Sequence, residues 1–391
     1  MYHFYHHILF IKLETMKVPL FVPWISNSDL NSISSALKSS QLTDGPVLRK
    51  FESQFAKLTK SKFAIGVSNG TEALHLSLVA LGIGKNDEVI IPDMTFIATS
   101  NAVVLSGAKP VLSDIDSSLN ISPDSIQKAI TNNTKAIMPV HFAGLSCNMK
   151  KIKQIAKENN LKIIEDCAHS IGTYFDKKHV GTFGDTGCFS FYPTKNITTI
   201  EGGMIITNSK GIAKKLQTLR NHGLSRTLIQ RNKTHAPWEY DVQTPGHNFR
   251  LDEIRATLGV SQLKRLKAMN LMRKNAANYY SKKLKNISGI EIPNLSNAKN
   301  HVYHLYVIRI KPEFGISRNT IHKKLFKKGI HTTVHYKPLH TFSYLKKYLT
   351  KNEQFPNSLN AFKECLSLPL YPKITHIQQD YVIDNLLKLQ K

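Results

Sequence analysis

Cysteine is scarce in this 391-residue sequence, and long apolar runs are absent. Cys147, Cys167, Cys188 and Cys365 are spaced too widely for a CxxC metal or redox motif, and four cysteines are too few for a small disulfide-held scaffold. No run of 18 or more apolar residues occurs, which argues against a membrane-spanning helix. These absences predict a cytoplasmic chain with no metal site and no membrane insertion.

Acidic residues are also few, and the formal net charge of +26 follows from 53 Lys and Arg against 27 Asp and Glu. Such a charge suggests nucleic acid or an anionic membrane as partner. Only ten of the basic residues are Arg, however, and the lysines form no unbroken block of five or six. We therefore expect the lysine excess to be distributed over a solvated surface, with no nucleic-acid partner and room for a small anion site.

The ends of the chain differ in character from its middle. Residues 1–16 are largely apolar and aromatic but lack a basic n-region and a cleavage site, so they are a poor signal peptide. We interpret them as an N-terminal extension that is either a start-codon artefact or a loosely attached arm. The remaining length suits one large α/β domain with a smaller partner.

Between residues 63 and 207, short β-branched runs alternate with helical patterns. Such alternation is typical of a largely parallel sheet covered by helices on both faces, so seven runs predict one large domain. The predicted strands are 63–67, 88–92, 110–114, 135–140, 161–165, 187–191 and 203–207.

Beyond residue 207, two segments look helical, 208–224 and 251–286, and the polar stretch between them has Trp238 as its one large anchor. Spaced strands and helices follow, which predicts a smaller α+β unit. We place the large domain at 17–260 and the small C-terminal domain at 261–391. The small domain's predicted elements are strands 304–310 and 330–336, a helix near 318–329 and a final helix from about 376.

Lys195 follows a predicted strand, at the edge of an α/β sheet where ligands bind. A lysine there becomes a nucleophile if desolvation or a neighbouring cation lowers its pKa. Asp166 also ends a strand, where its carboxylate can pair with a cationic ring nitrogen, and His169 can donate a hydrogen bond to a ring oxygen. The plainer alternatives are a solvated lysine, a capping aspartate and a packed histidine.

A phosphate site is the second candidate feature. In the stretch VSNGTEALHLSL, Gly70 and Thr71 open a helix whose free N–H groups and positive end can hold an anion, and the Ser190 hydroxyl can add to it. Phe96 follows another strand and can stack on a planar cofactor, or can simply belong to the core. A phosphate cradle, an aromatic platform, an acid and a lysine together indicate pyridoxal 5′-phosphate (PLP).

These residues lie in motifs that resemble those of the DegT/DnrJ/StrS family of nucleotide-sugar aminotransferases, which have the type I PLP-dependent fold of aspartate aminotransferase. The resemblance covers the chain from about Lys17 to its C-terminus. The matching motifs include SNGTEAL (68–74), DMTFIAT (93–99), EDCAHSIGT (165–173), FSFYPTKNITTIEGG (189–203), GHNFRLDEIRATLGVSQL (246–263) and TVHYKPLH (333–340).

The resemblance implies a role for each motif residue. Lys195 would hold the internal aldimine, Asp166 would pair with the pyridine nitrogen, and His169 would lie near the phenolic oxygen. Ala168 would pack beneath the ring and Phe96 above it. The phosphate would be bound by Gly70, Thr71 and Ser190, and by Asn248 from the other subunit of an obligate homodimer. Arg250, His335 and Tyr336 are candidates for sugar or diphosphate contacts, with an ordinary strand as the alternative for the last two.

The implied reaction is a ping-pong transamination that serves polysaccharide biosynthesis. It moves an amino group from a donor, with L-glutamate expected, to a keto group, expected at C4, of a sugar linked to a nucleoside diphosphate. Relatives with His in place of the lysine perform dehydration, so Lys195 favours transamination. The alternatives are a dehydrating or deaminating sugar enzyme with the same cofactor and a non-catalytic regulator of the same fold.

Overall fold

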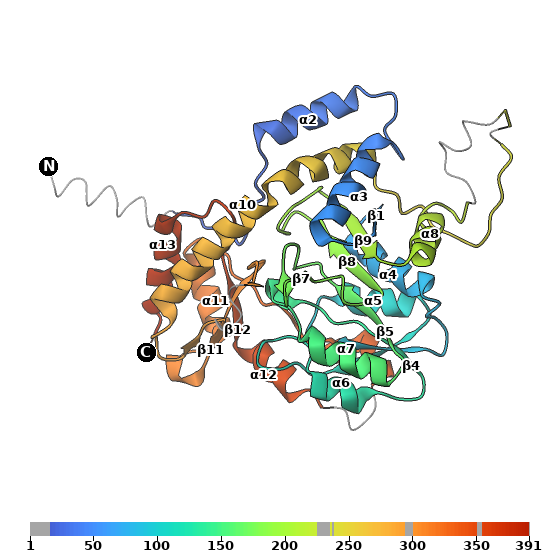
Figure 1. The fold of residues 1–391 in the computed structure, drawn as a ribbon. Helices are drawn as coiled ribbons and strands as arrows, with labels where there is room; N and C mark the ends of the chain where they lie inside the picture. The colour runs from blue at the N-terminus through green and yellow to red at the C-terminus, as the bar shows by residue number, and fades with distance from the viewer. Residues whose placement is uncertain (1–15, 225–234, 237, 294–299, 350–353, 391) are drawn as a thin grey trace.

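The computed structural model describes residues 16–224, 235–236, 238–293, 300–349 and 354–390 (Figure 1). All of the predicted N-terminal extension except Met16 lies outside the described residues, so that interpretation stays a prediction.

A seven-stranded sheet forms the centre of the large domain, as the sequence predicts. Its spatial order is β1-β9-β8-β5-β4-β2-β3, and only β9 runs antiparallel to its neighbours. The chain passes from β8 to β9 through residues 191–202 without a crossover helix, which is why those two strands are antiparallel. The strands are β1 (Phe63–Val67), β2 (Glu88–Pro92), β3 (Lys109–Ser113), β4 (Thr134–Ile137), β5 (Lys162–Asp166), β8 (Thr186–Ser190) and β9 (Gly203–Thr207).

Helices cover both faces of this sheet because successive strand residues point to opposite sides. In β9, for example, Ile205 packs in the cluster around α4, whereas Met204 and Ile206 pack in the cluster around α3. A third cluster joins α6 and α7 to β2, β4 and β5. The helices are α2 (Asn27–Leu37), α3 (Pro46–Thr59), α4 (Gly70–Ala80), α5 (Ile97–Leu105), α6 (Pro123–Ala129), α7 (Met149–Glu158) and α8 (Lys210–Leu219); a hairpin, β6 (Tyr174–Phe175) and β7 (Lys178–His179), and a 3₁₀ turn, η1 (Phe142–Gly144), complete the region.

The long helix α10 (Glu253–Leu284) crosses the molecule diagonally and links the two parts of the chain (Figure 1). Its first half packs on α2 and α3, and its second half packs on α13 in the C-terminal region. The predicted boundary at residue 260 falls inside this helix, and the division into domains stays a prediction. The C-terminal elements are β10 (Ile290–Glu291), β11 (Tyr306–Ile310), η3 (Pro312–Phe314), α11 (Arg318–Lys327), η4 (Leu339–Thr341), η5 (Ser343–Tyr348), α12 (Pro356–Glu364), β12 (Cys365–Leu368) and α13 (His376–Leu387).

Two local expectations are wrong. Residues 330–336 do not form a strand: Ile330 and Thr333 make single bridges to Val18 and Ser367, and the chain then leaves the three-stranded sheet β10-β11-β12 to reach the active-site region. Alternating apolar residues mimic a strand there because they pack against other elements. Trp238 is 72% exposed, so it does not anchor its segment within a single chain.

The lysine excess is uneven along the chain, whereas its spread over the solvated surface stays a prediction. Residues 261–391 hold 24 of the 53 basic residues but only six of the 27 acidic ones, so most of the net charge belongs to the C-terminal third of the chain. Among the described residues, no helix is both long enough and apolar enough to cross a membrane.

Candidate active site

The parallel strands bring their C-terminal ends to one edge of the sheet, where α/β proteins bind ligands. Strand β5 ends at Asp166 beside β8, which ends at Ser190; Asp166 is in register with Cys188. Strand β2 leads into residues 93–96, and β1 leads into the start of α4 at Gly70. Four predicted site segments therefore meet at one edge because the sheet topology places them there.

Lys195 lies in the loop that joins β8 to β9, and its backbone N–H donates to the carbonyl of Tyr192 at 2.9 Å. Burial of the ammonium group lowers its pKa from 10.5 to about 8, although the negative charge of Asp166 opposes the shift. A larger share of the amine is therefore neutral at pH 7 than in an ordinary lysine. The loop thus presents an amine that can act as a nucleophile.

Asp166 is buried and has two hydrogen-bond donors. The N–H of Ala168 donates to Oδ1 at 3.1 Å, and the Thr99 hydroxyl donates to Oδ2 at 3.0 Å. Burial nevertheless raises the pKa of the carboxyl group, and the two hydrogen bonds and the charge of Lys195 only partly offset it. A cationic ring nitrogen beside Asp166 would supply the opposite charge that favours the ionised carboxylate.

His169 is a buried neutral imidazole, because burial keeps its pKa well below the usual value and the Lys195 charge adds to this effect. The N–H of Ala143 donates to Nδ1 at 3.3 Å. This pattern assigns the ring proton to Nε2, which lies 3.1 Å from the hydroxyl oxygen of Tyr336. His169 therefore donates at Nε2 toward Tyr336, the residue that we predicted to contact substrate.

The start of α4 and the end of β8 form the open part of the site. A Cβ atom on Gly70 would lie 2.7 Å from Cβ of Ser190, so only glycine allows this close approach. Asn69 caps the helix through the N–H of Glu72. Gly70, Thr71 and Ser190 are all half-buried, so the helix N-terminus and a hydroxyl group face the same opening.

Phe96 precedes α5 and is 55% exposed, which excludes the interpretation of this residue as plain core. Its ring lies 5.9 Å from that of Tyr336, and the Tyr336 ring lies 6.3 Å from that of Phe142. The rings of Phe96, Tyr336 and Phe142 thus form a row that leads from the exposed edge of the site to buried His169. An exposed aromatic ring beside such a site is available to stack on a planar ligand.

Two of the remaining candidates, Asn248 and Arg250, have partners outside this group, whereas the ring of His335 lies 4.7 Å from that of Tyr336. Asn248 is exposed and forms a backbone bridge with Asn221, and Arg250 donates to the Asn221 side chain at 2.6 Å. Among the described residues, no hydrogen bond or ion pair joins these two side chains to Lys195, Asp166 or His169. His335 bonds to the Ser367 hydroxyl at 2.7 Å, and burial together with the Lys195 charge lowers its pKa to about 3.

Two residues of the site were missed at the sequence level. Thr99 is the sixth residue after Asp93 in the DMTFIAT motif, and only its contact with Asp166 reveals its importance. The ring of His304 lies 4.3 Å from that of His169. The backbone N–H of His304 donates to the carbonyl of Ala143. No local pattern signals His304, because it comes from the distant C-terminal region.

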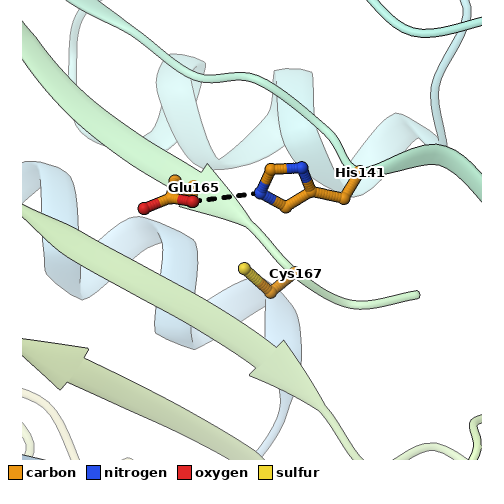
Figure 2. Close-up of side chains that lie close together, drawn as sticks. All are labelled: His141, Glu165 and Cys167. Carbon is orange, nitrogen blue, oxygen red and sulfur yellow. Dashed lines mark hydrogen bonds and ion pairs between the residues drawn. The ribbon is translucent and has the colours of Figure 1, made fainter. Parts of the chain in front are cut away.

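His141, Glu165 and Cys167 form a buried cluster of a type that can hold a metal ion (Figure 2). The His141 Nε2 lies 3.1 Å from Glu165, and its Nδ1 accepts the N–H of Cys147. Glu165 also accepts three backbone N–H groups, from residues 181, 183 and 184. Burial keeps the Cys167 thiol protonated by raising its pKa well above the usual value. These hydrogen bonds occupy both ring nitrogens of His141 and both carboxylate oxygens of Glu165, so this cluster instead fixes the end of β5 on which Asp166 lies.

These residues fit PLP. The amine of Lys195 is the group that condenses with an aldehyde. Asp166 is a buried acid that a cationic ring nitrogen would keep in its charged form, and any residue larger than glycine at position 70 would collide with Ser190.

The comparisons with known proteins agree with this chemistry. The model of the DegT/DnrJ/EryC1/StrS aminotransferase family matches residues 23–387. The chain belongs to this family. It is 37% identical over 378 residues to the spore coat polysaccharide biosynthesis protein SpsC of Bacillus subtilis, a match that covers 96% of this chain and 97% of SpsC.

Two solved structures of the family are similar throughout. Helicobacter pylori PseC, an aminotransferase involved in the biosynthesis of pseudoaminic acid, matches with a TM-score of 0.89 at 29% identity, over 96% of this chain and 99% of PseC. The Streptococcus pneumoniae protein Spr1654, assigned as a sugar aminotransferase, was solved in a PMP form that matches with a TM-score of 0.89 at 28% identity, over 95% of this chain and 99% of that one; it was also solved in a PLP form.

The predicted family, the type I PLP-dependent fold and the cofactor are therefore confirmed. This member of the family is a PLP-dependent sugar aminotransferase. Transamination is thereby favoured over the dehydrating or deaminating enzyme and over the non-catalytic regulator.

Proposed function

We propose that this enzyme transfers an amino group from L-glutamate to the C4 keto group of a sugar linked to a nucleoside diphosphate, by a ping-pong mechanism in which Lys195 binds PLP covalently. The observation that carries the proposal is the convergence of Lys195, Asp166 and His169 at one edge of the sheet, with Gly70 and Ser190 beside them.

The proposed roles follow from the environment of each residue. Bound PLP supplies an electron-accepting ring that stabilises negative charge on the carbon next to the nitrogen. Asp166 holds the proton on the ring nitrogen, since its buried carboxylate gains the opposite charge that it lacks. With the cofactor bound, the Lys195 amine would act first as a base that accepts a proton at Nζ and then as the acid that gives it back. Its lowered pKa allows both steps near neutral pH.

The other residues bind and orient. Gly70 and Thr71 hold the phosphate through backbone N–H groups, and Ser190 donates its hydroxyl proton. Phe96 covers one face of the ring and Ala168 the other. His169 holds Tyr336 in place through its Nε2–H, and the ring oxygen of the cofactor would lie beside this pair. Arg250, His335 and Tyr336 contact the sugar or its diphosphate.

We further propose a homodimer in which Asn248 and Arg250 act on the partner's site. Both side chains lie away from Lys195 within one chain, and the exposed Asn248 has room to meet a second subunit. This arrangement would give each site residues from both chains. The cytoplasmic location also stays a prediction.

A half-reaction tests the substrates separately. Protein loaded with pyridoxamine phosphate is mixed with 4-keto and 3-keto sugars, each linked to UDP, GDP or dTDP, and the return of the PLP absorbance band is followed by stopped flow. We expect the band to return with a 4-keto sugar nucleotide and not with the free sugar. Return only with 3-keto substrates would reject the C4 assignment, and a panel of amino acids on the PLP form tests glutamate in the same way.

A further inference from the structure

The loop that carries Lys195 is tied mainly to itself. The Thr198 hydroxyl donates to the carbonyl of Phe191 at 2.9 Å, and the N–H of Thr199 donates to the same carbonyl at 3.0 Å. These bonds shape the loop but do not fix where it lies relative to the rest of the site.

Asn196, the residue after Lys195, connects the loop to other elements. It is 3% exposed, and its Nδ2 donates to Oδ1 of Asn270 at 2.7 Å and to the carbonyl of Val302 at 3.2 Å. Its own Oδ1 is buried without a hydrogen-bond partner. A buried amide with an unpaired oxygen is costly, so its donor bonds must offset that cost.

Asn270, on α10, extends this connection to the His169 side of the site. Its Nδ2 donates to the carbonyl of Ile171 at 3.1 Å, two residues beyond His169. A Cβ on Gly172 would lie 2.6 Å from the same Nδ2, so a glycine with φ of 87° leaves space for Asn270. Val302 lies two residues before His304, whose ring packs on His169. Both hydrogen-bonded paths from Asn196 therefore end beside His169.

We propose that Asn196 and Asn270 form an amide pair that positions Lys195 relative to His169. The inference rests on the proposed role of Lys195 and adds two positioning residues to it. Neither residue needs to touch the cofactor or the substrate: the pair acts by holding the Lys195 loop against α10 and the turn at residues 169–172.

A role in fold stability alone makes different predictions. If the pair only stabilises the fold, its loss lowers the melting temperature and leaves the surviving folded enzyme unchanged. If it positions Lys195, its loss changes the environment of the amine in folded protein, since a displaced ammonium group regains contact with water. The ionisation of Lys195 in the apoprotein separates the two, because it requires neither cofactor nor activity.

The experiment uses Asn196→Ala, Asn270→Ala and the double variant, with Asn278→Ala as the matched control at an exposed position of the same helix. Apoprotein is labelled with trace acetic anhydride between pH 6 and 11, and mass spectrometry gives the labelling midpoint of Lys195. We expect a midpoint near pH 8 in the wild type and the control, and an upward shift of about one unit in each single variant.

Kinetics of the PLP-loaded proteins supply the second readout. We expect kcat to fall about ten- to a hundred-fold in either single variant, with KM values within about two-fold of the wild type, because a small displacement of the amine slows the proton transfers more than binding. The double variant should be no slower than the slower single variant, since either change already breaks the pair.

Asn270→Ser is included in case an alanine variant does not fold. Asn270 is only half-buried, and serine is small and polar, so this variant should fold. A wild-type labelling midpoint in the folded variants, or losses of kcat that multiply in the double variant, would overturn the inference. Failure of the proposed function gives a different result: wild-type protein would bind no PLP at Lys195, while the apoprotein labelling would still decide the role of the pair.

Discussion

The inner and outer halves of the active site are built in different ways. Asp166 and His169, at the inner end, are buried, and each accepts a backbone N–H from a neighbouring turn. Gly70, Ser190 and Phe96, at the outer end, are partly exposed and rely on close backbone approach and helix geometry.

The difference shows which part of the chemistry a single chain can supply. The inner half is already formed within one chain, since burial shifts the pKa values of Lys195, Asp166 and His169. The outer half is open, and among the described residues of one chain no hydrogen bond joins the side chains of Asn248 and Arg250 to it. We infer that the inner half sets reactivity, whereas the outer half sets affinity and is completed by a second subunit.

Loss of the inner carboxylate should have the largest effect. Asp166→Ala is expected to lower kcat/KM about a hundred- to a thousand-fold, because the ring nitrogen loses the charge that keeps it protonated. Asp166→Asn retains the shape but not the charge, so it should be almost as slow. Steady-state kinetics decide this, and an Asn variant with wild-type rates would remove Asp166 from the mechanism.

Crowding the outer half should weaken cofactor binding by less. Gly70→Ala places a Cβ against Ser190 and is expected to weaken PLP binding about ten- to a hundred-fold, a cost of roughly 1–3 kcal/mol. Titration of apoprotein with PLP measures the change. Ser190→Gly removes the colliding atom but also the hydroxyl proposed to bind the phosphate, so the double variant is compared with Ser190→Gly alone. Gly70→Ala should weaken PLP binding less in that background, and an undiminished loss would mean that this contact is not the cause.

A shared outer half can be tested by mixing subunits. Asn248→Ala should weaken PLP binding about tenfold, through loss of a hydrogen bond to the phosphate. The Asn248→Ala chain is refolded together with the inactive Lys195→Ala chain at limiting PLP. In a hybrid dimer, one site then combines the intact Lys195 of one chain with the intact Asn248 of the other. Activity should therefore rise above that of either parent variant. Activity that stays at the parental level would show that Asn248 serves its own chain.

The smallest expected effect belongs to Thr99, which supports Asp166. Thr99→Val removes one hydrogen bond to the ionised carboxylate, so the pKa of Asp166 rises and activity is lost at a higher pH as the solution is acidified. We expect kcat to fall about five-fold at pH 7, equivalent to roughly 1 kcal/mol, with the acid limb moved up by less than about one unit. An unchanged acid limb in the pH profile would contradict this role.

The sequence predicts the inner half well because strand ends are visible in it. The runs before Asp166 and Lys195, residues 161–165 and 187–191, are short and mainly apolar, and parallel strands place such ends together. Thr99 and His304 are not predictable in this way. Thr99 acts through a hydrogen bond to Asp166, which is 67 residues away in the sequence. His304 comes from the C-terminal region and packs on His169.

The errors have a common physical origin. Residues 330–336 alternate like a strand, yet tertiary packing leads them out of the sheet so that Tyr336 meets His169. Trp238 looks like an anchor by size alone, but its exposure depends on the surroundings. Patterns within a segment therefore predict which element forms more reliably than which partner it contacts.

The central claim is that Lys195 is the residue that binds PLP covalently. Borohydride reduction of the PLP-loaded enzyme, followed by peptide mass spectrometry, tests it directly, with Lys214→Ala as a surface control and Lys195→Ala as the decisive variant. We predict a pyridoxyl phosphate group on Lys195 alone in the wild type and the control, and none in Lys195→Ala. Stoichiometric modification of a different lysine, or retention of the modification in Lys195→Ala, would contradict the account.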